Sequence, residues 1–356
     1  MRAVIIAGGS GTRLRPLTYN TPKPMVPLFD KPFLQYQIEL LREHGIKEII
    51  INLHYLSDSI RNVLGDGSQL GVKLFYSLED KALGTAGAVK HAEEFFDDEP
   101  MLVFNGDILT DVDLSAVLRA HKETQARATL TLIRVEDPTA YGLVMMDDTR
   151  ITRFLEKPSM DEARALNVDT VNAGIYVLDP DVFRYVPKGE AYSFERGLFP
   201  LLLQLEERIT GHVTDSYWLD IGSPLKYMQA HSDVLQKLVK VQMPGIEIRP
   251  SVWVGPDADV DETADLRGPI YVGAGAKIRK KAKIHEYSVI GAGVTVDDRA
   301  ILERAMIGAN STVGEEAVLQ RCIVGRNCAI GAHAQLGHNM VLADDSVVGK
   351  GTRIAN

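Results

Sequence analysis

Residues 4–18 read VIIAGGSGTRLRPLT, and this stretch decides how the first part of the chain folds. The β-branched run Val4–Ala7 indicates a buried strand. The glycines after it predict a tight turn whose backbone N–H groups can face an anion, because no Cβ blocks the approach. Arg13 can hold phosphate oxygens with its planar guanidinium, and Lys23 adds a point charge on a loop between two prolines. The stretch therefore predicts a strand that ends in a phosphate-binding loop.

Other glycine-rich loops fit this stretch less well. The dinucleotide-binding pattern G-x-G-x-x-G needs a third glycine, which does not follow Gly9-Ser10-Gly11, and an acid at the end of the second strand, where His54 stands. The P-loop pattern G-x-x-x-x-G-K-[ST] does not occur. A glycine turn with a purely structural role is the remaining alternative. Residues 1–31 carry five basic side chains and one acid, Asp30, which favours the phosphate interpretation.

The region up to about residue 230 alternates between two hydrophobic periods. Short β-branched runs predict strands at Val4–Ala7, Glu48–Leu53, Val72–Tyr76, Met101–Phe104 and Thr129–Val135. Amphipathic patterns predict helices at Phe33–His44, Ser57–Leu64, Thr85–Phe96 and Leu114–Lys122. This alternation predicts an α/β fold with a Rossmann-like mixed, mostly parallel sheet. Ligands of such a sheet bind at the carboxyl ends of its strands.

A six-residue repeat begins near residue 252. Aliphatic side chains recur every six residues from Val254 to Leu302, and the series resumes after one five-residue step at Ile307 and after a second at Val324. A small residue mostly stands two positions before each of them. One large and one small inward side chain per unit predict a short strand and a turn, and three units close one coil. The repeat predicts about six stacked coils around an aliphatic core.

Composition narrows the classes of function. The chain has 356 residues and a formal net charge of -9, which argues against a general nucleic-acid binder. Its two cysteines, Cys322 and Cys328, both fall at the small inward position of the repeat, and we expect them to be structural. No segment has the ~20 apolar residues that span a membrane, and no signal peptide is evident. We therefore expect a cytoplasmic protein without membrane partners.

The glycine loop from Gly8 to Thr18, followed by Lys23, resembles the signature of the nucleoside-diphosphate-sugar pyrophosphorylases, which are sugar-1-phosphate nucleotidylyltransferases. The resemblance covers the whole chain, because several members carry a C-terminal hexapeptide-repeat domain. It implies a catalytic domain at residues 1–232, a helix end and linker at 233–250, and a left-handed β-helix at 251–356. It also implies a homo-oligomer assembled through the β-helix and the catalytic domain.

The resemblance implies roles for the residues that match the family's motifs. The nucleotide is expected at Gly8, Gly9, Gly11, Thr12, Arg13, Lys23, Gly84 and Thr85. The sugar phosphate is expected at Gly142, Glu156, Lys157 and Asn172. Asp107 and Asp220 are expected to hold Mg²⁺, an ion that takes one or two carboxylates and completes its octahedron with phosphates and water. Arg13, Lys23 and Asp107 are the expected catalytic residues.

The expected reaction is an in-line displacement at the α-phosphorus of a nucleoside triphosphate, with release of pyrophosphate. The second pKa of a phosphate monoester lies near ~6, so the sugar 1-phosphate is already largely dianionic at neutral pH. A general base is therefore not required, and none of the nine histidines is expected to be catalytic. Positioning and electrostatic stabilisation would supply the rate.

The base and the sugar are less strongly marked. Glu79 and Asp80 precede the Leu83–Gly87 segment, and their carboxylates suit the hydrogen-bond donors of guanine. Residues 193–200, SFERGLFP, resemble the mannose-1-phosphate guanylyltransferase branch. We therefore expect GTP and mannose 1-phosphate, with thymidylyl, uridylyl or adenylyl transfer to glucose 1-phosphate as alternatives. A catalytically silent regulatory subunit is a weaker alternative. So is an acyltransferase that uses a histidine of the repeats, namely His285, His333 or His338.

Overall fold

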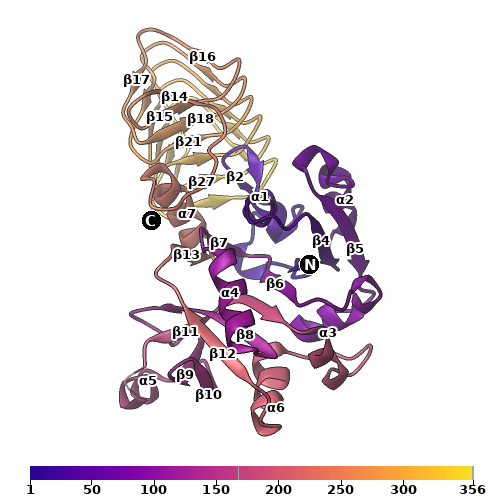
Figure 1. Cartoon of the computed structure of the whole chain (residues 1–356). Helices are drawn as coiled ribbons and strands as arrows, with labels where there is room; N and C mark the ends of the chain where they lie inside the picture. Colours follow the sequence, from indigo (N-terminus) through magenta and orange to yellow (C-terminus); the bar gives the residue numbers. More distant parts are fainter. Residues whose placement is uncertain (167, 355–356) are drawn as a thin grey trace. The chain divides into compact units, whose positions relative to one another are not determined.

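The computed structural model describes residues 1–166 and 168–354, and its contacts divide the chain into two compact units. Unit 1 comprises Met1–Gly9 and Gln37–Trp218, and unit 2 comprises Ser10–Tyr36 and Leu219–Asn356 (Figure 1). The domain boundaries expected from the sequence, at residues 232 and 250, remain a prediction. The compact units are divided at other positions in the chain. The reason is that Ser10–Tyr36, which we call the loop segment, is hydrogen-bonded to the C-terminal repeats.

Unit 1 is built on a nine-stranded sheet with the order β5-β4-β1-β6-β11-β8-β12-β10-β9. Its strands are β1 (Ala3–Ile6), β4 (Glu48–Leu53), β5 (Lys73–Leu78), β6 (Met101–Asn105), β8 (Ala128–Arg134), β9 (Gly142–Asp147), β10 (Arg150–Glu156), β11 (Thr170–Leu178) and β12 (Ile209–Val213). The run β5-β4-β1-β6 and the pair β8–β12 are parallel. The sheet is mixed, as predicted: β11 pairs antiparallel with β6, β8 and β9, and β10 pairs antiparallel with β9 and β12.

The helices of unit 1 follow the predicted alternation. They are α1 (Phe33–Glu43, which crosses the boundary of the units), α2 (Ser57–Leu64), α3 (Gly84–His91), α4 (Leu114–Thr124), α5 (Met160–Leu166) and α6 (Phe199–Gln204). The short strands β7 (Ile108–Thr110) and β13 (Trp218–Asp220) complete the elements of this region. Helix α3 ends earlier than predicted, and a separate turn of 3₁₀-helix follows it. Within the described residues, no helix combines the length and the apolar character that crossing a bilayer requires.

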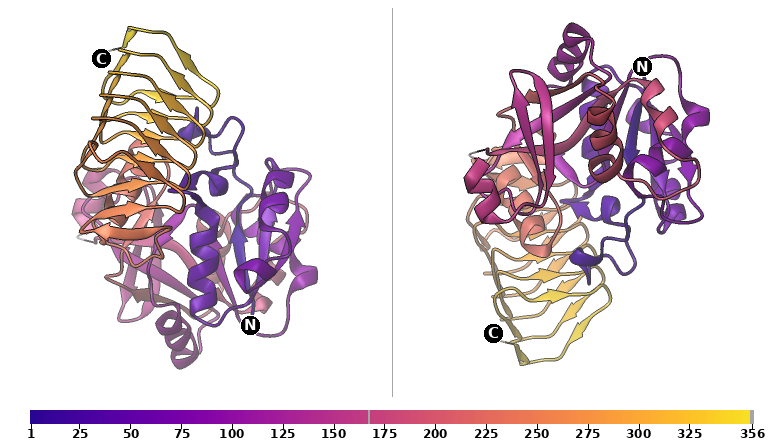
Figure 2. Two further views of the ribbon diagram at one scale, coloured as in Figure 1. Left: turned by 90° about the horizontal axis from the view of Figure 1, so that it is seen from above. Right: turned by 90° about the horizontal axis from the view of Figure 1, so that it is seen from below.

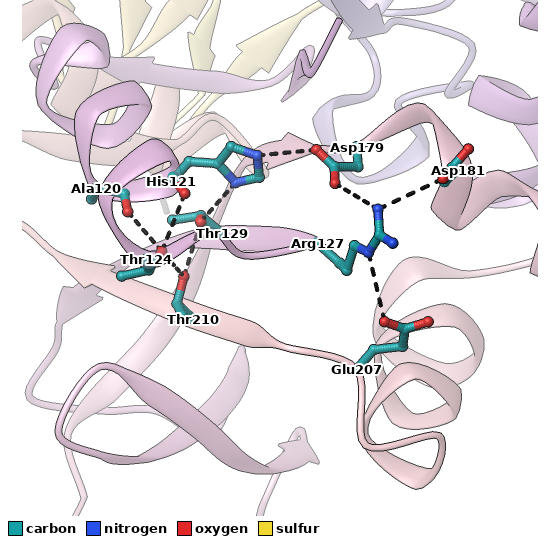
Figure 3. A network of polar contacts seen from close by, with 9 residues as sticks. All are labelled: Ala120, His121, Thr124, Arg127, Thr129, Asp179, Asp181, Glu207 and Thr210. Atoms are coloured by element: carbon teal, nitrogen blue, oxygen red, sulfur yellow. Dashed lines mark hydrogen bonds and ion pairs between the residues drawn. The ribbon is translucent and has the colours of Figure 1, made fainter. Parts of the chain in front are cut away.

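A partly buried polar network connects α4 to the sheet (Figure 3). His121 Nδ1 lies 3.0 Å from Thr129 Oγ1 on β8, and that hydroxyl lies 2.9 Å from Thr210 Oγ1 on β12. His121 Nε2 lies 3.4 Å from a carboxylate oxygen of Asp179, whose second oxygen accepts a hydrogen bond from Arg127. Burial lowers the pKa of His121, so the imidazole is neutral at pH 7. The network satisfies buried polar groups and gives this histidine a structural role.

The repeats of unit 2 form stacked coils, and the strands of successive coils pair to make three parallel sheets (Figure 2). The first contains β15 (Val252–Val254), β18 (Ile270–Val272), β21 (Val289–Ile290), β24 (Met306–Ile307), β27 (Ile323–Val324) and β30 (Val341–Leu342), with β14 (Ile246–Arg249) antiparallel at its edge. The second contains β16 (Asp259–Val260), β19 (Lys277–Ile278), β22 (Thr295–Val296), β25 (Thr312–Val313), β28 (Ala329–Ile330) and β31 (Val347–Val348). The third contains β17 (Asp265–Leu266), β20 (Lys283–Ile284), β23 (Ile301–Glu303), β26 (Val318–Gln320), β29 (Gln335–Leu336) and β32 (Arg353–Ile354).

The register of these strands confirms the six-residue repeat. Val272 pairs with Val254 on one side and with Ile290 on the other, so three repeat units separate neighbours within a sheet. The architecture is consistent with the predicted left-handed β-helix. The inward aliphatic and small side chains form one continuous buried core that contains Cys322 and Cys328, as predicted.

The loop segment and helix α7 (Pro224–Leu235) complete unit 2. Within the loop segment, β2 (Pro27–Leu28) and β3 (Lys31–Pro32) pair antiparallel as a short hairpin. The two residues between the strands, Phe29 and Asp30, form its tip, and Phe29 has the left-handed φ of 58°. Such a φ is costly for a bulky residue and needs support from its surroundings.

Candidate functional site

The predicted site residues are distributed over both units. Unit 1 holds Gly8, Gly9, Gly84, Thr85, Asp107, Gly142, Glu156, Lys157 and Asn172. Unit 2 holds Gly11, Thr12, Arg13, Lys23 and Asp220. The boundary passes through the glycine loop itself, between residues 9 and 10.

The glycine loop of unit 2 folds back on itself. Thr18 Oγ1 donates a hydrogen bond to the Gly11 carbonyl at 2.8 Å. A Cβ on Gly11 would lie 2.9 Å from Cβ of Lys23, and the φ of Gly11 is 61°, so glycine is required on both counts. The loop therefore brings Gly11 and Lys23 together, and Thr12 and Arg13 form a short 3₁₀ turn between them.

Arg13 and Asp220 approach each other within unit 2. A Cβ on Gly222 would lie 3.3 Å from Arg13 Nη1 and 2.9 Å from Asp220 Oδ2, so both charged groups lie against this glycine. Lys226, in the first turn of α7, forms an ion pair with Asp220 Oδ1. Lys226 belongs to none of the motifs that mark the expected site. The signal that could have found it is its place one helical turn after the Ser223 N-cap that follows Gly222.

Asp107 follows strand β6 in unit 1, at the carboxyl end that a parallel sheet offers to ligands. The turn before it needs glycine, because a Cβ on Gly106 would lie 2.5 Å from the Ile6 carbonyl oxygen. Two residues earlier in the chain, Asn105 Oδ1 is buried without a hydrogen-bond partner among the described residues.

The oxygen donors of Asp107 and Asp220 suit Mg²⁺. The described residues include no group of three or more His, Cys, Asp and Glu side chains able to hold a metal ion. Magnesium does not need such a cage, because one or two carboxylates suffice when phosphates and water complete its coordination. The donor chemistry of these two aspartates therefore fits this ion.

The residues expected at the sugar phosphate converge in unit 1. Gly142 and Glu156 are paired across strands β9 and β10. A Cβ on Gly142 would lie 2.9 Å from Glu156 Oε2 and 3.9 Å from Cβ of Asn172, so the three residues meet at one place. Lys157 follows with a left-handed φ of 50°, and its N–H is bonded to the Tyr141 carbonyl at 2.9 Å. The exposed Lys157 side chain is thereby placed directly after the end of β10.

Glu195 connects this group to helix α3. Asn172 Nδ2 donates a hydrogen bond to Tyr176 Oη at 2.8 Å, and the Tyr176 hydroxyl donates to Glu195 Oε1 at 3.1 Å. Ser193 Oγ donates to Glu195 Oε2 at 2.7 Å, and Thr85 Oγ1 lies 3.4 Å from the same oxygen. One carboxylate thus bridges a residue expected at the nucleotide and one expected at the sugar. From the sequence alone, the segment around Glu195 indicates only a resemblance to the guanylyltransferase branch.

The surroundings of Glu156 favour the protonated form of its carboxyl group more than bulk water does. Burial raises the pKa of Glu156, and the negative charge of Glu195 raises it further, against the opposing effect of Lys157. Burial likewise raises the pKa of Tyr176 well above its usual value, with the Glu195 charge as the next cause. The phenol therefore stays neutral and keeps its hydroxyl as a donor.

Glu79 supports the start of α3 and lies beside the glycine loop of unit 1. Its Oε2 accepts a hydrogen bond from the Leu83 N–H at 3.0 Å, and its Oε1 lies 3.6 Å from the position of a Cβ on Gly8. Burial raises the pKa of Glu79. Gly84 has a φ of 73°, and a Cβ there would lie 2.7 Å from the Tyr192 carbonyl oxygen. The Glu79 carboxylate thus lies beside Gly8 and is bonded to Leu83, the residue before Gly84.

Comparison with protein families gives two matches. The model described as nucleotidyl transferase matches residues 2–237, and the model described as GMPPB C-terminal domain matches residues 266–356. The UTP–glucose-1-phosphate uridylyltransferase of Synechocystis is 36% identical over 322 residues, which are 86% of this chain and 82% of that protein. The mannose-1-phosphate guanylyltransferase of Mycobacterium tuberculosis is 38% identical over 236 residues, 66% of this chain and 64% of that protein. The alignment thus spans less than two thirds of the guanylyltransferase.

Solved structures resemble about two thirds of the chain. HddC from Yersinia pseudotuberculosis, crystallised as a complex with GMP-PN, matches with a TM-score of 0.56 and 29% identity over 65% of this chain and 99% of that chain. A putative glucose-1-phosphate thymidylyltransferase from Bacillus anthracis matches with a TM-score of 0.58 and 26% identity over 65% of this chain and 94% of that chain.

Proposed function

The chain belongs to the nucleotidyl transferase family, and on this premise we propose that it transfers a nucleotidyl group from a nucleoside triphosphate to a sugar 1-phosphate and releases pyrophosphate. The observation that carries the proposal is the bridge made by Glu195. It joins Thr85, expected at the nucleotide, to Asn172, expected at the sugar, through the Tyr176 hydroxyl. A two-substrate reaction needs its reactants held in a fixed mutual geometry, and a connection between the two expected binding regions supports this.

In the proposed reaction the sugar phosphate attacks the α-phosphorus as a dianion, so the protein supplies no general base. Lys157 holds the attacking phosphate, and Glu156 and Asn172 hold sugar hydroxyls. Arg13 and Lys23 offset the charge of the triphosphate as pyrophosphate leaves. Catalysis then consists of positioning and electrostatic stabilisation, in which fixed positive groups lie where negative charge develops.

We propose Asp107 and Asp220 as the ligands of Mg²⁺. When bound, the ion supplies positive charge to the triphosphate. Lys226 forms an ion pair with Asp220, so a bound cation would have to share the Asp220 carboxylate with Lys226 or displace the Lys226 ammonium group. This assignment rests on the sequence motifs and on the donor chemistry of the two carboxylates.

For the substrates we propose GTP and mannose 1-phosphate. Glu79 supports guanine, because its carboxylate lies beside Gly8 and can accept from guanine N–H groups. The match of residues 266–356 to the GMPPB C-terminal model also supports this choice. UTP and glucose 1-phosphate are the second candidate pair, supported by the Synechocystis uridylyltransferase, which aligns over a larger share of both chains.

A matrix of reactions tests the proposal. The purified chain is incubated with Mg²⁺, each of GTP, UTP, ATP and dTTP, and each of mannose 1-phosphate and glucose 1-phosphate, while pyrophosphate release is followed. The highest kcat/KM is expected for GTP with mannose 1-phosphate. Highest activity with UTP and glucose 1-phosphate would establish the second pair, and no pyrophosphate release from any pair would refute the function. We further propose that the protein is a homo-oligomer, which its mass in solution tests. We also propose that it is cytoplasmic, which cell fractionation tests.

A further inference from the structure

The hairpin of the loop segment is hydrogen-bonded to the β-helix through Asp30. Asp30 Oδ2 accepts hydrogen bonds from the Tyr271 hydroxyl at 2.7 Å and from the Ala274 N–H at 3.0 Å. Its Oδ1 accepts from the Ala292 N–H at 2.9 Å. A Cβ on Gly273 would lie 2.6 Å from Asp30 Oδ2, so the coil leaves room for this carboxylate only because residue 273 is glycine. Hydrogen bonds to a charged acceptor are stronger than those between neutral groups.

The residue beside Asp30 is also held within unit 2. The Phe29 N–H donates to His231 Nε2 at 3.1 Å, and His231 Nδ1 donates to the Tyr227 carbonyl at 3.0 Å. The Phe29 ring packs edge-on against Tyr271, with ring centroids 5.1 Å apart. These contacts support the left-handed φ of Phe29 and fix the hairpin tip in one orientation.

A second polar contact holds the loop segment at a position closer in sequence to Lys23. Arg326 Nη2, on the β-helix, donates to Thr21 Oγ1 at 2.6 Å. The same guanidinium is held by Asp344 Oδ2, at 2.7 Å from Nη2 and 3.1 Å from Nε. Thr21 is buried and precedes Lys23 by two residues in the chain. Arg326 therefore acts on the backbone that carries a residue expected to bind the triphosphate.

The apolar packing beneath these contacts is incomplete. A cavity of about 150 Å³ lies between the loop segment and the coils, lined by Leu17, Val26, Met306, Ile307 and Val324 among others. A space of this size lacks the dispersion contacts that a packed interior supplies. The polar contacts of Asp30 and Arg326 consequently carry a larger share of the attachment than they would above a filled core.

We infer that Asp30 and Arg326 are positioning residues for nucleotide binding, through which the β-helix holds the loop that presents Arg13 and Lys23. The β-helix then has a role in the reaction besides assembly. This inference rests on the proposed function. It predicts a selective effect, because the residues expected at the sugar phosphate belong to unit 1 and have no part in these contacts.

Steady-state kinetics of the full-length protein test the inference. Asp30→Asn is expected to raise KM for the nucleoside triphosphate about tenfold, because it removes the charge that strengthens three hydrogen bonds. KM for the sugar phosphate is expected to stay within about twofold. Arg326→Met and Tyr271→Phe are expected to act in the same direction with smaller effects. Asp259→Asn is the matched control, since that carboxylate pairs with Arg279 on the β-helix.

The double variant Asp30→Asn/Tyr271→Phe is expected to resemble Asp30→Asn alone, because the two residues share one contact. Pyrophosphate release by the unsubstituted protein separates the failure of the proposed function from the failure of this inference. If that protein is active and Asp30→Asn keeps the triphosphate KM of Asp259→Asn, the inference is overturned. A general loss of structure would change both KM values or the amount of active enzyme. Should Asp30→Asn not fold, Tyr271→Phe decides by the same criterion.

Discussion

The Tyr176 hydroxyl donates a hydrogen bond to Glu195 Oε1 at 3.1 Å while accepting one from Asn172 Nδ2 at 2.8 Å. The ring is fully buried, so no water replaces either partner. The orientation of the Asn172 amide is thereby coupled to a carboxylate that also reaches Thr85. A single phenol oxygen keeps the two expected binding regions of unit 1 in register.

Replacing Tyr176 by Phe tests this coupling. The variant keeps the ring but leaves Asn172 Nδ2 and Glu195 Oε1 without their common partner. An unsatisfied buried group costs about 1–3 kcal/mol, so kcat/KM for the sugar phosphate is expected to fall about tenfold or more. Tyr185→Phe serves as control, because that hydroxyl donates to Glu207 outside the cluster. Equal activity of the two variants would contradict the assignment.

The pH dependence of sugar-phosphate binding is expected to move with Glu195. The pKa of Glu156 is raised, first by burial and then by the Glu195 charge, so Glu156 takes up a proton at a higher pH than an ordinary glutamate. Activity that needs the Glu156 carboxylate is therefore lost earlier on acidification. Glu195→Gln removes the like charge and is expected to shift the acid limb of kcat/KM to lower pH. A limb that stays in place, or shifts upward, would show that Glu156 does not define it.

Arg13 is expected to be indispensable for turnover. Removal of an arginine that offsets charge on a reacting phosphate lowers kcat by about 10³-fold or more in related chemistry. Arg13→Ala is therefore expected to lose most of its kcat at saturating substrates. Arg15→Ala is the matched control, because the Arg15 guanidinium lies over the Tyr19 ring at 5.3 Å. Near-normal turnover of Arg13→Ala would remove this residue from the mechanism.

Unit 2 is expected to lose stability in mild acid through His231. Burial lowers the pKa of this imidazole to about 4, and Nε2 must stay unprotonated to accept from Phe29. The unfolded state binds the proton from about pH 6.5 downward and the folded state only near pH 4, so stability falls as pH falls through this window. Between pH 7.5 and pH 5 the loss is about 2 kcal/mol.

Denaturant unfolding at the two pH values measures this loss. His231→Gln removes the titrating group, and its free energy of unfolding is expected to change less between pH 7.5 and pH 5 than that of the unsubstituted protein. Identical pH dependence in the two proteins would disprove the role of His231.

Both cysteines are expected to resist thiol reagents in the folded protein. Cys322 and Cys328 lie in the core of the β-helix, and burial raises the pKa of Cys322 to about 12. The thiolate is the reactive species, so modification should require unfolding. Mass spectrometry after alkylation with and without denaturant checks this, and rapid labelling of the native protein would contradict it.

Local patterns were sufficient to predict most of the elements. The predicted strands and helices of unit 1 agree with the structure to within two residues at each end, except for α3. The hexapeptide register was correct throughout, because each repeat unit carries its own inward side chains and pairs only with its neighbours. Strand direction beyond β6 was not predictable in this way, because parallel and antiparallel partners can share the same hydrophobic pattern.

The connections between site residues were beyond the sequence for a related reason. Glu195 and Lys226 gain their roles from partners in the folded protein. No motif in the sequence indicates that either side chain contacts the expected site residues. Asp30 looked like an isolated acid in a basic segment until the fold placed it against the Tyr271 hydroxyl. Motifs identify residues that contact a ligand more readily than residues that hold those residues in place.

The contact between Thr21 and Arg326 has a consequence for how the protein is made. The two residues are 305 positions apart, and a ribosome adds about 5–20 residues per second. The glycine loop therefore emerges among the first residues of the nascent chain, roughly 15–60 s before the coil that carries Arg326. Until then Thr21 lacks its Arg326 partner, and a transcript truncated before codon 326 yields a product in which this contact never forms.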